Sequence, residues 1–222
     1  MKFEGIGGRF PGLCVAEGVM RGAAIRERSD DLEAFKPQVS AKVRSAYTLE
    51  NVKDDPLFRA YRDFFWSVGV DPTKTRPASE ALVRRILAGR PLPAINTAVD
   101  AYNLASVQHS VPVAAFDAAT LRGGLTMRFA AGGEEFLGIG MQEPLLLKPN
   151  QVVLCDEEKL IAVYPYRDSD GTKVTAATKD IHIVSCGVPG VGAEKVLDAY
   201  RACAEYLRRY CGAAPDEPVL SP

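Results

Sequence analysis

The chain has 222 residues, of which 47% are hydrophobic and 25% are charged, a composition typical of a globular domain. Lys and Arg number 27 and Asp and Glu number 28, which gives a formal net charge of -1. This balance excludes a protein that relies mainly on non-specific attraction to a phosphate backbone, because such proteins are strongly basic. Any contact with nucleic acid therefore needs a local basic patch.

Cysteine and histidine usage limits the chemistry. The five cysteines form no Cys-x-x-Cys pair and the chain has two histidines, so we expect no disulfide scaffold, no metal site and no cofactor. No apolar run approaches the roughly 18 residues that a membrane helix needs. The first twelve residues carry glycines and charges, unlike the basic stretch and apolar core of a secretion signal. We expect a cytoplasmic protein without a membrane partner.

The first 60 residues predict an N-terminal strand and a helical extension. Apolar residues mixed with glycine between Pro11 and Ile25 predict a strand with a bend. Between Asp30 and Leu57, apolar residues recur every three or four positions and would share one helical face. They are Leu32, Phe35, Val39 and Val43. Pro37 falls within this pattern, so we expect two helical pieces instead of one.

Two further helices are predicted over residues 56–68 and 79–89. The first carries an aromatic stripe at helical spacing, for which we expect core packing. Its members are Phe58, Tyr61, Phe65 and Trp66. The second helix follows a loop with two prolines, and either Thr75 or Ser79 could cap its start. Gly89 is expected to end it in the left-handed conformation.

The second half of the chain predicts mainly sheet. Residues 125–129 and 136–139 flank a glycine-rich turn and predict one hairpin, while residues 152–155 and 160–164 flank a polar turn and predict another. A further strand is predicted at 181–185. Strands joined by hairpins, in runs separate from the helices, indicate an α+β fold.

The C-terminal part predicts a long helix followed by a tail. Apolar residues at helical spacing between Ala193 and Cys211 predict the helix, and Gly212 ends it. Residues 213–222 are rich in proline and are expected to form a tail. No Gly-, Ser- or Pro-rich linker and no repeat interrupts the chain, so we expect residues 1–222 to form a single domain.

Two polar stretches are candidates for a functional site. A helix is predicted from Thr97 to Gln108, and Asn96, Asp100 and Asn103 lie around its start. Asp100 and Asn103 would share a helical face, but Thr97 and Asp100 also fit a capping box, which is a purely structural role. The second stretch, Arg167–Thr175, places cations, carboxylates and hydroxyls after an apolar strand, where binding residues often lie. A solvated turn is the alternative for that stretch.

Three segments resemble one known family. They are Leu92–Asn103, Pro112–Asp117 and Leu121–Arg128. They are similar to the B3/B4 domain, the editing module of the phenylalanyl-tRNA synthetase beta chain, whose matching stretch has Asn-x-x-Val-Asp-x-x-Asn, then Pro-Leu-His-Ala-Phe-Asp, then a Leu-x-Gly-Gly turn. Weaker similarity extends the match to roughly residues 61–185. The chain resembles a freestanding member of this family, whose additional signature would be Lys74–Leu82.

The resemblance implies a fold, a partner and a set of site residues. The expected fold is a layered β/β/α arrangement with a β-sandwich-like core of hairpins and flanking helices. The expected partner is the 3′ end of an aminoacyl-tRNA, from which the pocket would remove a wrong amino acid by ester hydrolysis. The expected substrate-binding residues are Arg76, Glu80, Asn96, Asp100, Asn103, Arg167 and Asp168. Cations that could contact phosphate are Lys42, Arg44, Arg84, Arg85 and Arg90.

Two departures from the family pattern leave the function open. Ala114 occupies the position of the family's His before Ala-Phe-Asp, and residues 167–170 replace a Gly-Gly-Glu-like segment, so amino-acid specificity should differ. Ester hydrolysis can still proceed with an oriented water and the terminal hydroxyl of the tRNA. The leading hypothesis is a trans-acting tRNA-editing hydrolase. The alternatives are a non-catalytic module that binds RNA or an amino acid, and an enzyme that acts on a small molecule.

Overall fold

The computed structural model describes residues 1–221, and they form the expected α+β fold. The helices are α1 (Asp30–Ala46), α2 (Pro56–Ser67), α3 (Ala78–Leu87), α4 (Thr97–His109) and α5 (Ala193–Cys211). The strands are β1 (Lys2–Glu4), β2 (Val15–Arg21), β3 (Val113–Asp117), β4 (Thr126–Phe129), β5 (Glu135–Phe136), β6 (Leu145–Leu146), β7 (Val152–Cys155), β8 (Leu160–Val163), β9 (Arg167–Asp168), β10 (Ile181–Cys186), β11 (Ala214–Pro215) and β12 (Val219–Ser221).

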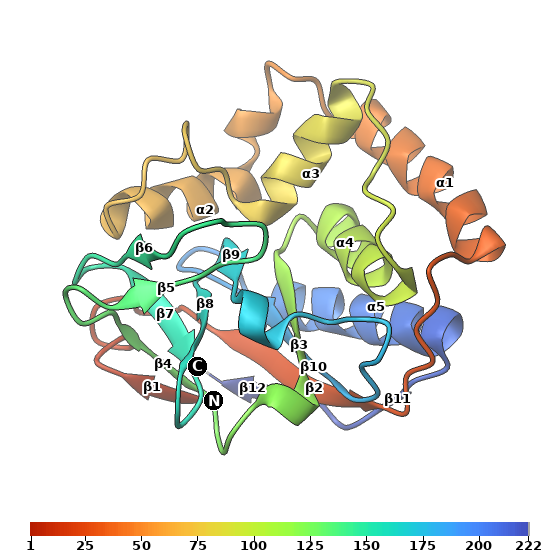
Figure 1. Cartoon of the computed structure of the whole chain (residues 1–222). Helices are drawn as coiled ribbons and strands as arrows, with labels where there is room; N and C mark the ends of the chain where they lie inside the picture. The colour runs from red at the N-terminus through yellow and green to blue at the C-terminus, as the bar shows by residue number, and fades with distance from the viewer. Residues whose placement is uncertain (222) are drawn as a thin grey trace.

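The strands form two main sheets within residues 1–221. The first has the order β1-β4-β7-β8-β9, and the second has the order β11-β2-β10-β3, with β12 also pairing with β2. Helices α4 and α5 pack on the second sheet, and α1 and α3 pack on α4 farther out (Figure 1). This is the layered arrangement of sheets and helices that the resemblance implies.

Helix α2 ties the two sheets together at one end. The Tyr61 hydroxyl donates a 2.6 Å hydrogen bond to the carbonyl oxygen of Cys186 at the end of β10. The ring of Phe64 packs edge-on against Tyr164, just after β8, with 6.0 Å between the ring centres. Trp66, which we expected in the same packed stripe, is 56% exposed, so that part of the prediction is wrong.

Glycines end two helices as predicted, but one predicted cap is wrong. Helix α5 has the predicted bounds, and Gly212 after it adopts φ +67°, in the left-handed region that favours glycine. Gly89 has φ +75° just beyond α3. Neither Thr75 nor Ser79 caps α3, whose N-cap position is Pro77. The Ser79 hydroxyl donates a hydrogen bond to the carbonyl oxygen of Ser110, 3.2 Å away.

Helix α1 is continuous, so the predicted break at Pro37 is wrong. Three members of the predicted stripe, Leu32, Val39 and Val43, are buried, which confirms the helical face. Pro37 lies on the opposite, exposed side of the helix. A proline costs a helix one backbone hydrogen bond, but the carbonyl oxygen that loses its partner on an exposed side can be hydrated.

The predicted hairpin of residues 125–129 with 136–139 is also wrong. Strand β4 pairs with β7 and, in parallel, with β1, whereas β5 pairs with β6 in a separate small hairpin. The second predicted hairpin, β7 with β8, is confirmed, as is the strand β10. The glycine-rich turn after Phe129 predicts a reversal of the chain, but it does not determine which strand is the partner of β4.

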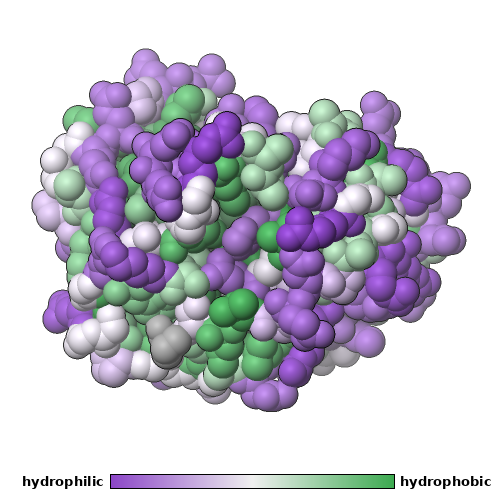
Figure 2. All heavy atoms as spheres, turned by 90° about the horizontal axis from the view of Figure 1, so that it is seen from below, coloured by the Kyte–Doolittle hydropathy of each residue, from purple (hydrophilic) through white to green (hydrophobic). Residues whose placement is uncertain are grey.

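Two strands of the predicted tail, β11 and β12, belong to the second sheet, so the prediction of a tail over residues 213–222 is wrong for the described part; residue 222 lies outside the described residues. Strands β11 and β12 both pair antiparallel with β2. Two side chains of β12 remain exposed, Val219 by 56% and Leu220 by 41%. Figure 2 shows the underside of the molecule, where hydrophilic side chains surround smaller apolar areas. Among residues 1–221, no helix combines the length and the apolar character needed to cross a bilayer.

Candidate functional site

A basic cleft of about 550 Å³ lies between α3, the loops before and after it, and the start of β9. Its cationic lining residues are Lys74, Arg76, Arg84, Arg85, Arg90 and Arg167. Asn103 on α4 supplies an amide to the same cleft. Within residues 1–221, Arg76, Arg85 and Arg90 have no carboxylate within ion-pair distance. The cleft is therefore a concentrated positive region on a protein whose formal net charge is -1.

An inner pocket of about 60 Å³ adjoins the basic cleft. Ala78, Tyr166 and Arg167 line both spaces, so these residues form the passage between them. The inner pocket is lined mainly by apolar side chains, with Asp168 as its carboxylate. A positively charged entrance that leads to a small apolar pocket with one acid is suited to a ligand with an anionic part and a small cationic or polar end.

Arg167 is held at this passage by its neighbours. Its guanidinium donates a 3.1 Å hydrogen bond to the carbonyl oxygen of Ile139. Its aliphatic part passes directly over Gly138, where a Cβ atom would lie only 2.5 Å from the Arg167 Cγ. A side chain at position 138 would therefore displace Arg167 from the passage.

Asp168 is an acid of the inner pocket whose pKa is shifted by burial. Burial raises its pKa from 3.8 to about 7, although the backbone amide of Ala115 and the charge of Arg167 favour the carboxylate. The residue is half-buried and lines the inner pocket. Burial also raises the pKa of Tyr102, and the charge of Asp168 adds to this effect. Strongly shifted acids in pockets are characteristic of functional sites.

Glu80 is engaged within the fold and not in the cleft. Its fully buried carboxylate accepts two hydrogen bonds of 2.8 Å from Arg62 on α2 and one of 2.6 Å from Arg84 on α3. Burial opposes ionisation of Glu80, but these hydrogen bonds and charges outweigh it and lower the pKa of Glu80. The residue thus fixes α3, and with it one wall of the basic cleft, against α2.

Asn96 caps α4, so the predicted capping box of Thr97 with Asp100 is wrong. The Asn96 side chain accepts hydrogen bonds from the amides of Ala98 and Val99, at 3.1 and 2.9 Å. The Thr97 hydroxyl instead accepts a hydrogen bond from the amide of Arg26, 71 positions earlier. Asn, like Thr, is a favoured cap because its side-chain oxygen reaches the first free amides of the helix.

Asp100 forms a buried ion pair between two helices. One carboxylate oxygen lies 2.7 Å from the Lys36 Nζ on α1, and the other accepts a 3.0 Å hydrogen bond from the amide of Ile95. The Asp100 side chain is 3% exposed and that of Lys36 is 9% exposed. The pair explains why these two charged residues are buried, and its members do not line the basic cleft or the inner pocket.

We expect Asp100→Asn to lower the free energy of unfolding by about 1 to 3 kcal/mol, a limited loss because Lys36 keeps Glu33 as a partner. The affinity for an aminoacyl-adenosine ligand should not change, because Asp100 lines neither the basic cleft nor the inner pocket. Chemical denaturation and calorimetric titration of the same preparation would measure both quantities. Asn103→Ala is the matched variant, since it should spare stability and reduce affinity. A loss of affinity in Asp100→Asn at unchanged stability would contradict this assignment.

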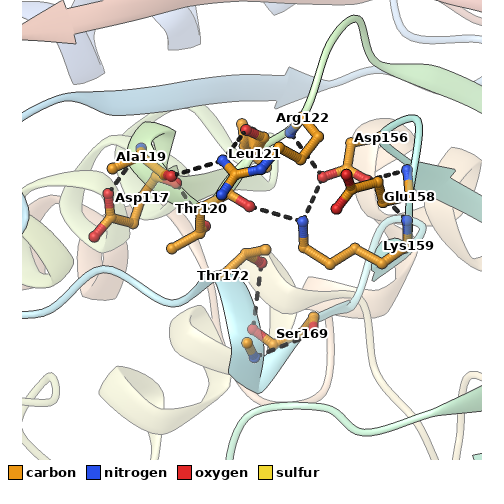
Figure 3. Close-up of polar contacts among 11 residues, drawn as sticks. Asp117, Ala119, Thr120, Leu121, Arg122, Asp156, Glu158, Lys159, Ser169 and Thr172 are labelled. Atoms are coloured by element: carbon orange, nitrogen blue, oxygen red, sulfur yellow. Dashed lines mark hydrogen bonds and ion pairs between the residues drawn. The ribbon is translucent and has the colours of Figure 1, made fainter.

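Two of the three segments that carry the family resemblance, Pro112–Asp117 and Leu121–Arg128, reach a polar junction with the turn after β7 (Figure 3). The carboxylate of Asp156 accepts hydrogen bonds from the amides of Arg122, Glu158 and Lys159, between 2.8 and 3.0 Å. The Lys159 ammonium bridges this carboxylate to the carbonyl oxygen of Thr120 at 2.7 Å. These contacts join the turn after β7 to the segment after β3, so this part of the motif has a structural role.

The structure thus brings together four of the seven predicted site residues. Arg76, Asn103 and Arg167 line the basic cleft, and Asp168 lies in the adjoining inner pocket. The other three, Glu80, Asn96 and Asp100, have their partners inside the fold. Sequence reasoning did not identify the apolar pocket walls Leu154, Ala162 and Cys186, because only strand register shows which face an apolar residue occupies.

Comparison with known proteins gives the chain its family. The B3/4 domain family matches residues 60–212. The phenylalanine–tRNA ligase beta subunit of Chromobacterium violaceum is 32% identical over 117 residues, which are 53% of this chain and 14% of that subunit. The corresponding subunit of Nocardia farcinica is 31% identical over 156 residues, 68% of this chain and 18% of that subunit. This chain therefore spans less than a fifth of the length of these relatives.

A solved structure shows the same fold. An N-terminal fragment of the phenylalanyl-tRNA synthetase beta subunit from Pyrococcus horikoshii aligns with a TM-score of 0.53 at 15% identity, covering 100% of this chain and 53% of that chain. At this identity the likeness concerns the fold alone. Since the family match covers more than half of the sequence, the chain belongs to the B3/4 domain family.

Proposed function

We propose that this protein is a cytoplasmic hydrolase that acts in trans on aminoacyl-tRNA and removes a wrong amino acid from its 3′ end. The observation that carries the proposal is the basic cleft that leads into the inner pocket with Asp168. The cations of the cleft suit the phosphates of the terminal nucleotides, and the pocket suits an amino acid. The relatives named above are subunits of a tRNA ligase, which supports RNA as the partner.

The geometry suggests a role for each group. Arg76 and Arg167 would contact terminal phosphates or the aminoacyl group, and Asn103 would donate or accept a hydrogen bond beside them. The ionised carboxylate of Asp168 would hold the ammonium group of the amino acid. A water would then add to the ester carbonyl, and the bond from the carbonyl carbon to the ribose oxygen would break. The products are a free amino acid and a tRNA with its terminal hydroxyl restored.

A binding and turnover comparison tests the hydrolase proposal. Purified protein is given an aminoacyl-adenosine ester and, separately, an analogue in which an amide replaces the ester. A hydrolase consumes the ester and binds the amide intact. Binding of both compounds with no consumption of the ester above the buffer rate would remove the catalytic claim.

That negative result would favour a second candidate function, a non-catalytic module that binds RNA or an aminoacyl group. Ala114 is the observation that favours it. This residue lines the inner pocket at the position where the family carries a His, so the pocket has one fewer side chain able to hydrogen-bond a water. In the proposed hydrolase, the terminal hydroxyl of the tRNA would compensate for that missing group.

We expect the double variant Arg76→Gln and Arg90→Gln to weaken tRNA binding and to flatten its dependence on salt. On a plot of log affinity against log salt concentration, the slope should fall by about 0.7 for each phosphate that the variant no longer neutralises. Fluorescence anisotropy with labelled tRNA at several salt concentrations measures this. Arg44→Gln is the matched control: the sequence suggested Lys42 and Arg44 as phosphate contacts, but the structure places both on the exposed side of α1, outside the cleft. An affinity that does not change with salt would contradict an RNA role and favour a small neutral ligand.

A further inference from the structure

The inner pocket is small compared with the space in front of it. Its volume is about 60 Å³, whereas the basic cleft has about 550 Å³. Pockets that hold drug-sized ligands usually have about 300 to 1,000 Å³, so the inner pocket is suited to a much smaller group. The phenylalanine side chain has seven non-hydrogen atoms and the valine side chain has three, so valine is the better fit to this small space.

Strand register fixes one wall of the inner pocket. Leu154 on β7 pairs with Ala162 on β8, and Ala162 pairs with Asp168 on β9. Residues directly opposite one another in a sheet point to the same face. Leu154, Ala162 and Asp168 therefore form a row across three strands, and all three line the pocket.

The second sheet supplies the facing wall. Ala114 on β3 pairs with Val184 on β10, and Cys186 lies two residues beyond Val184, so Ala114 and Cys186 share a face. Both line the inner pocket, which consequently lies between the two sheets. Ala162 is 3% exposed and Cys186 is 2% exposed. Packed strands resist displacement, and inserting extra atoms between them costs stability.

We infer that the inner pocket selects a small uncharged aminoacyl side chain, such as that of valine, and excludes the aromatic side chains of phenylalanine and tyrosine. The inference rests on the proposed function, because it names the class of aminoacyl ester that the site accepts. Ala162 and Leu154 are the residues that determine specificity, since both line the pocket and are buried in the packed sheet. Asp168 is the polar group at the same wall and would hold the ammonium group common to all amino acids.

Calorimetry with two hydrolysis-resistant ligands tests the inference. Both are 3′-amino-3′-deoxyadenosine amides, one carrying valine and the other phenylalanine. The valine compound should bind at least about tenfold more tightly, because pocket contacts discriminate by about 10 to 200-fold for each methylene group. Equal affinities, tighter binding of the phenylalanine compound, or no binding of either compound would overturn the inference.

Two variants with opposite expected effects show whether the pocket walls set this preference. Ala162→Leu fills the pocket and should weaken binding of the valine compound at least about tenfold. Leu154→Ala enlarges the pocket and should reduce the difference in affinity between the valine and the phenylalanine compound. If both variants fold and both keep the preference of the unmodified protein for the valine compound, Ala162 and Leu154 do not determine specificity. Melting curves identify a variant that fails to fold, in which case the wild-type comparison alone decides.

These ligands contain no ester, so their binding is independent of hydrolysis. A preference for valine with no turnover of any ester would keep the size selection and remove the hydrolase proposal. Rapid turnover of a tyrosyl ester with no preference for small side chains would keep the hydrolase and overturn the size selection.

Discussion

Asp168→Asn is expected to lower the rate of ester hydrolysis about 100 to 1000-fold and, at pH 8, to stabilise the folded protein. The rate falls because the neutral amide cannot pair with the ammonium group of the amino acid in a pocket largely shielded from water. The stability rises because burial disfavours the ionised Asp168 carboxylate, whose pKa it raises to about 7. We expect a gain of about 1 to 3 kcal/mol, allowing for partial exposure of the residue.

Both effects should depend on pH in a defined way. Between about pH 4 and 7 the folded state holds a proton on Asp168 that the unfolded state has released. The free energy of unfolding therefore falls as the pH rises through that window. The stability gain of Asp168→Asn should therefore be complete above pH 7 and vanish below about pH 4. The hydrolysis rate of the unmodified protein should increase with pH up to about 7, as the carboxylate forms.

Thermal melts at several pH values and single-turnover rates measure these effects. Asp170→Asn is the matched control, since Asp170 lies two residues away and forms only a half-exposed ion pair with Lys173. That variant should change stability by less than about 1 kcal/mol and leave the rate unchanged. An Asp168→Asn protein with full activity would exclude Asp168 from the site.

Glu80→Gln is expected to destabilise the fold by about 3 kcal/mol. The substitution leaves the guanidinium groups of Arg62 and Arg84, which are only 18% and 19% exposed, without their shared carboxylate. Removing one member of a buried ion pair typically costs about 3 to 5 kcal/mol, and partial exposure of the two arginines places this case at the lower end. Urea denaturation of the variant and of the unmodified protein gives the difference.

The pH dependence of Glu80→Gln provides a second check. Because the fold lowers the pKa of Glu80, its contribution is present above the pKa of 4.5 that it has when unfolded and is lost as the pH falls below it. The difference between the two proteins should therefore shrink in acid. Glu194→Gln serves as the control, since Glu194 on α5 is 79% exposed and should change stability by less than about 1 kcal/mol. Equal stability of Glu80→Gln and the unmodified protein at pH 7 would contradict the account of Glu80.

Local signals predicted the helices well and the sheet partners less well. Helix α5 follows directly from apolar spacing and from Gly212, both of which act within a few residues. Strand β4 pairs with β1, more than 120 residues earlier, and no local pattern specifies that partner. The expected break at Pro37 is absent, because the effect of a proline on a helix depends on whether its side of the helix is exposed.

The candidate site shows the same division between local and long-range information. Arg167 and Asp168 could be proposed from sequence because a polar loop after an apolar strand is a local feature. Asp100 has the spacing of a capping residue, but its partner Lys36 lies 64 positions away and is visible only in the fold. Ala162 and Cys186 could not be proposed as pocket walls, because their role depends on how two sheets face one another.

The most direct test of the account is the decay of the ester bond on a panel of mischarged tRNAs incubated with the purified protein. We predict that at least one tRNA carrying a small uncharged amino acid is deacylated well above the buffer rate, and that Asp168→Asn abolishes most of this increase. Decay at the buffer rate for every member of the panel would contradict the proposed hydrolase function.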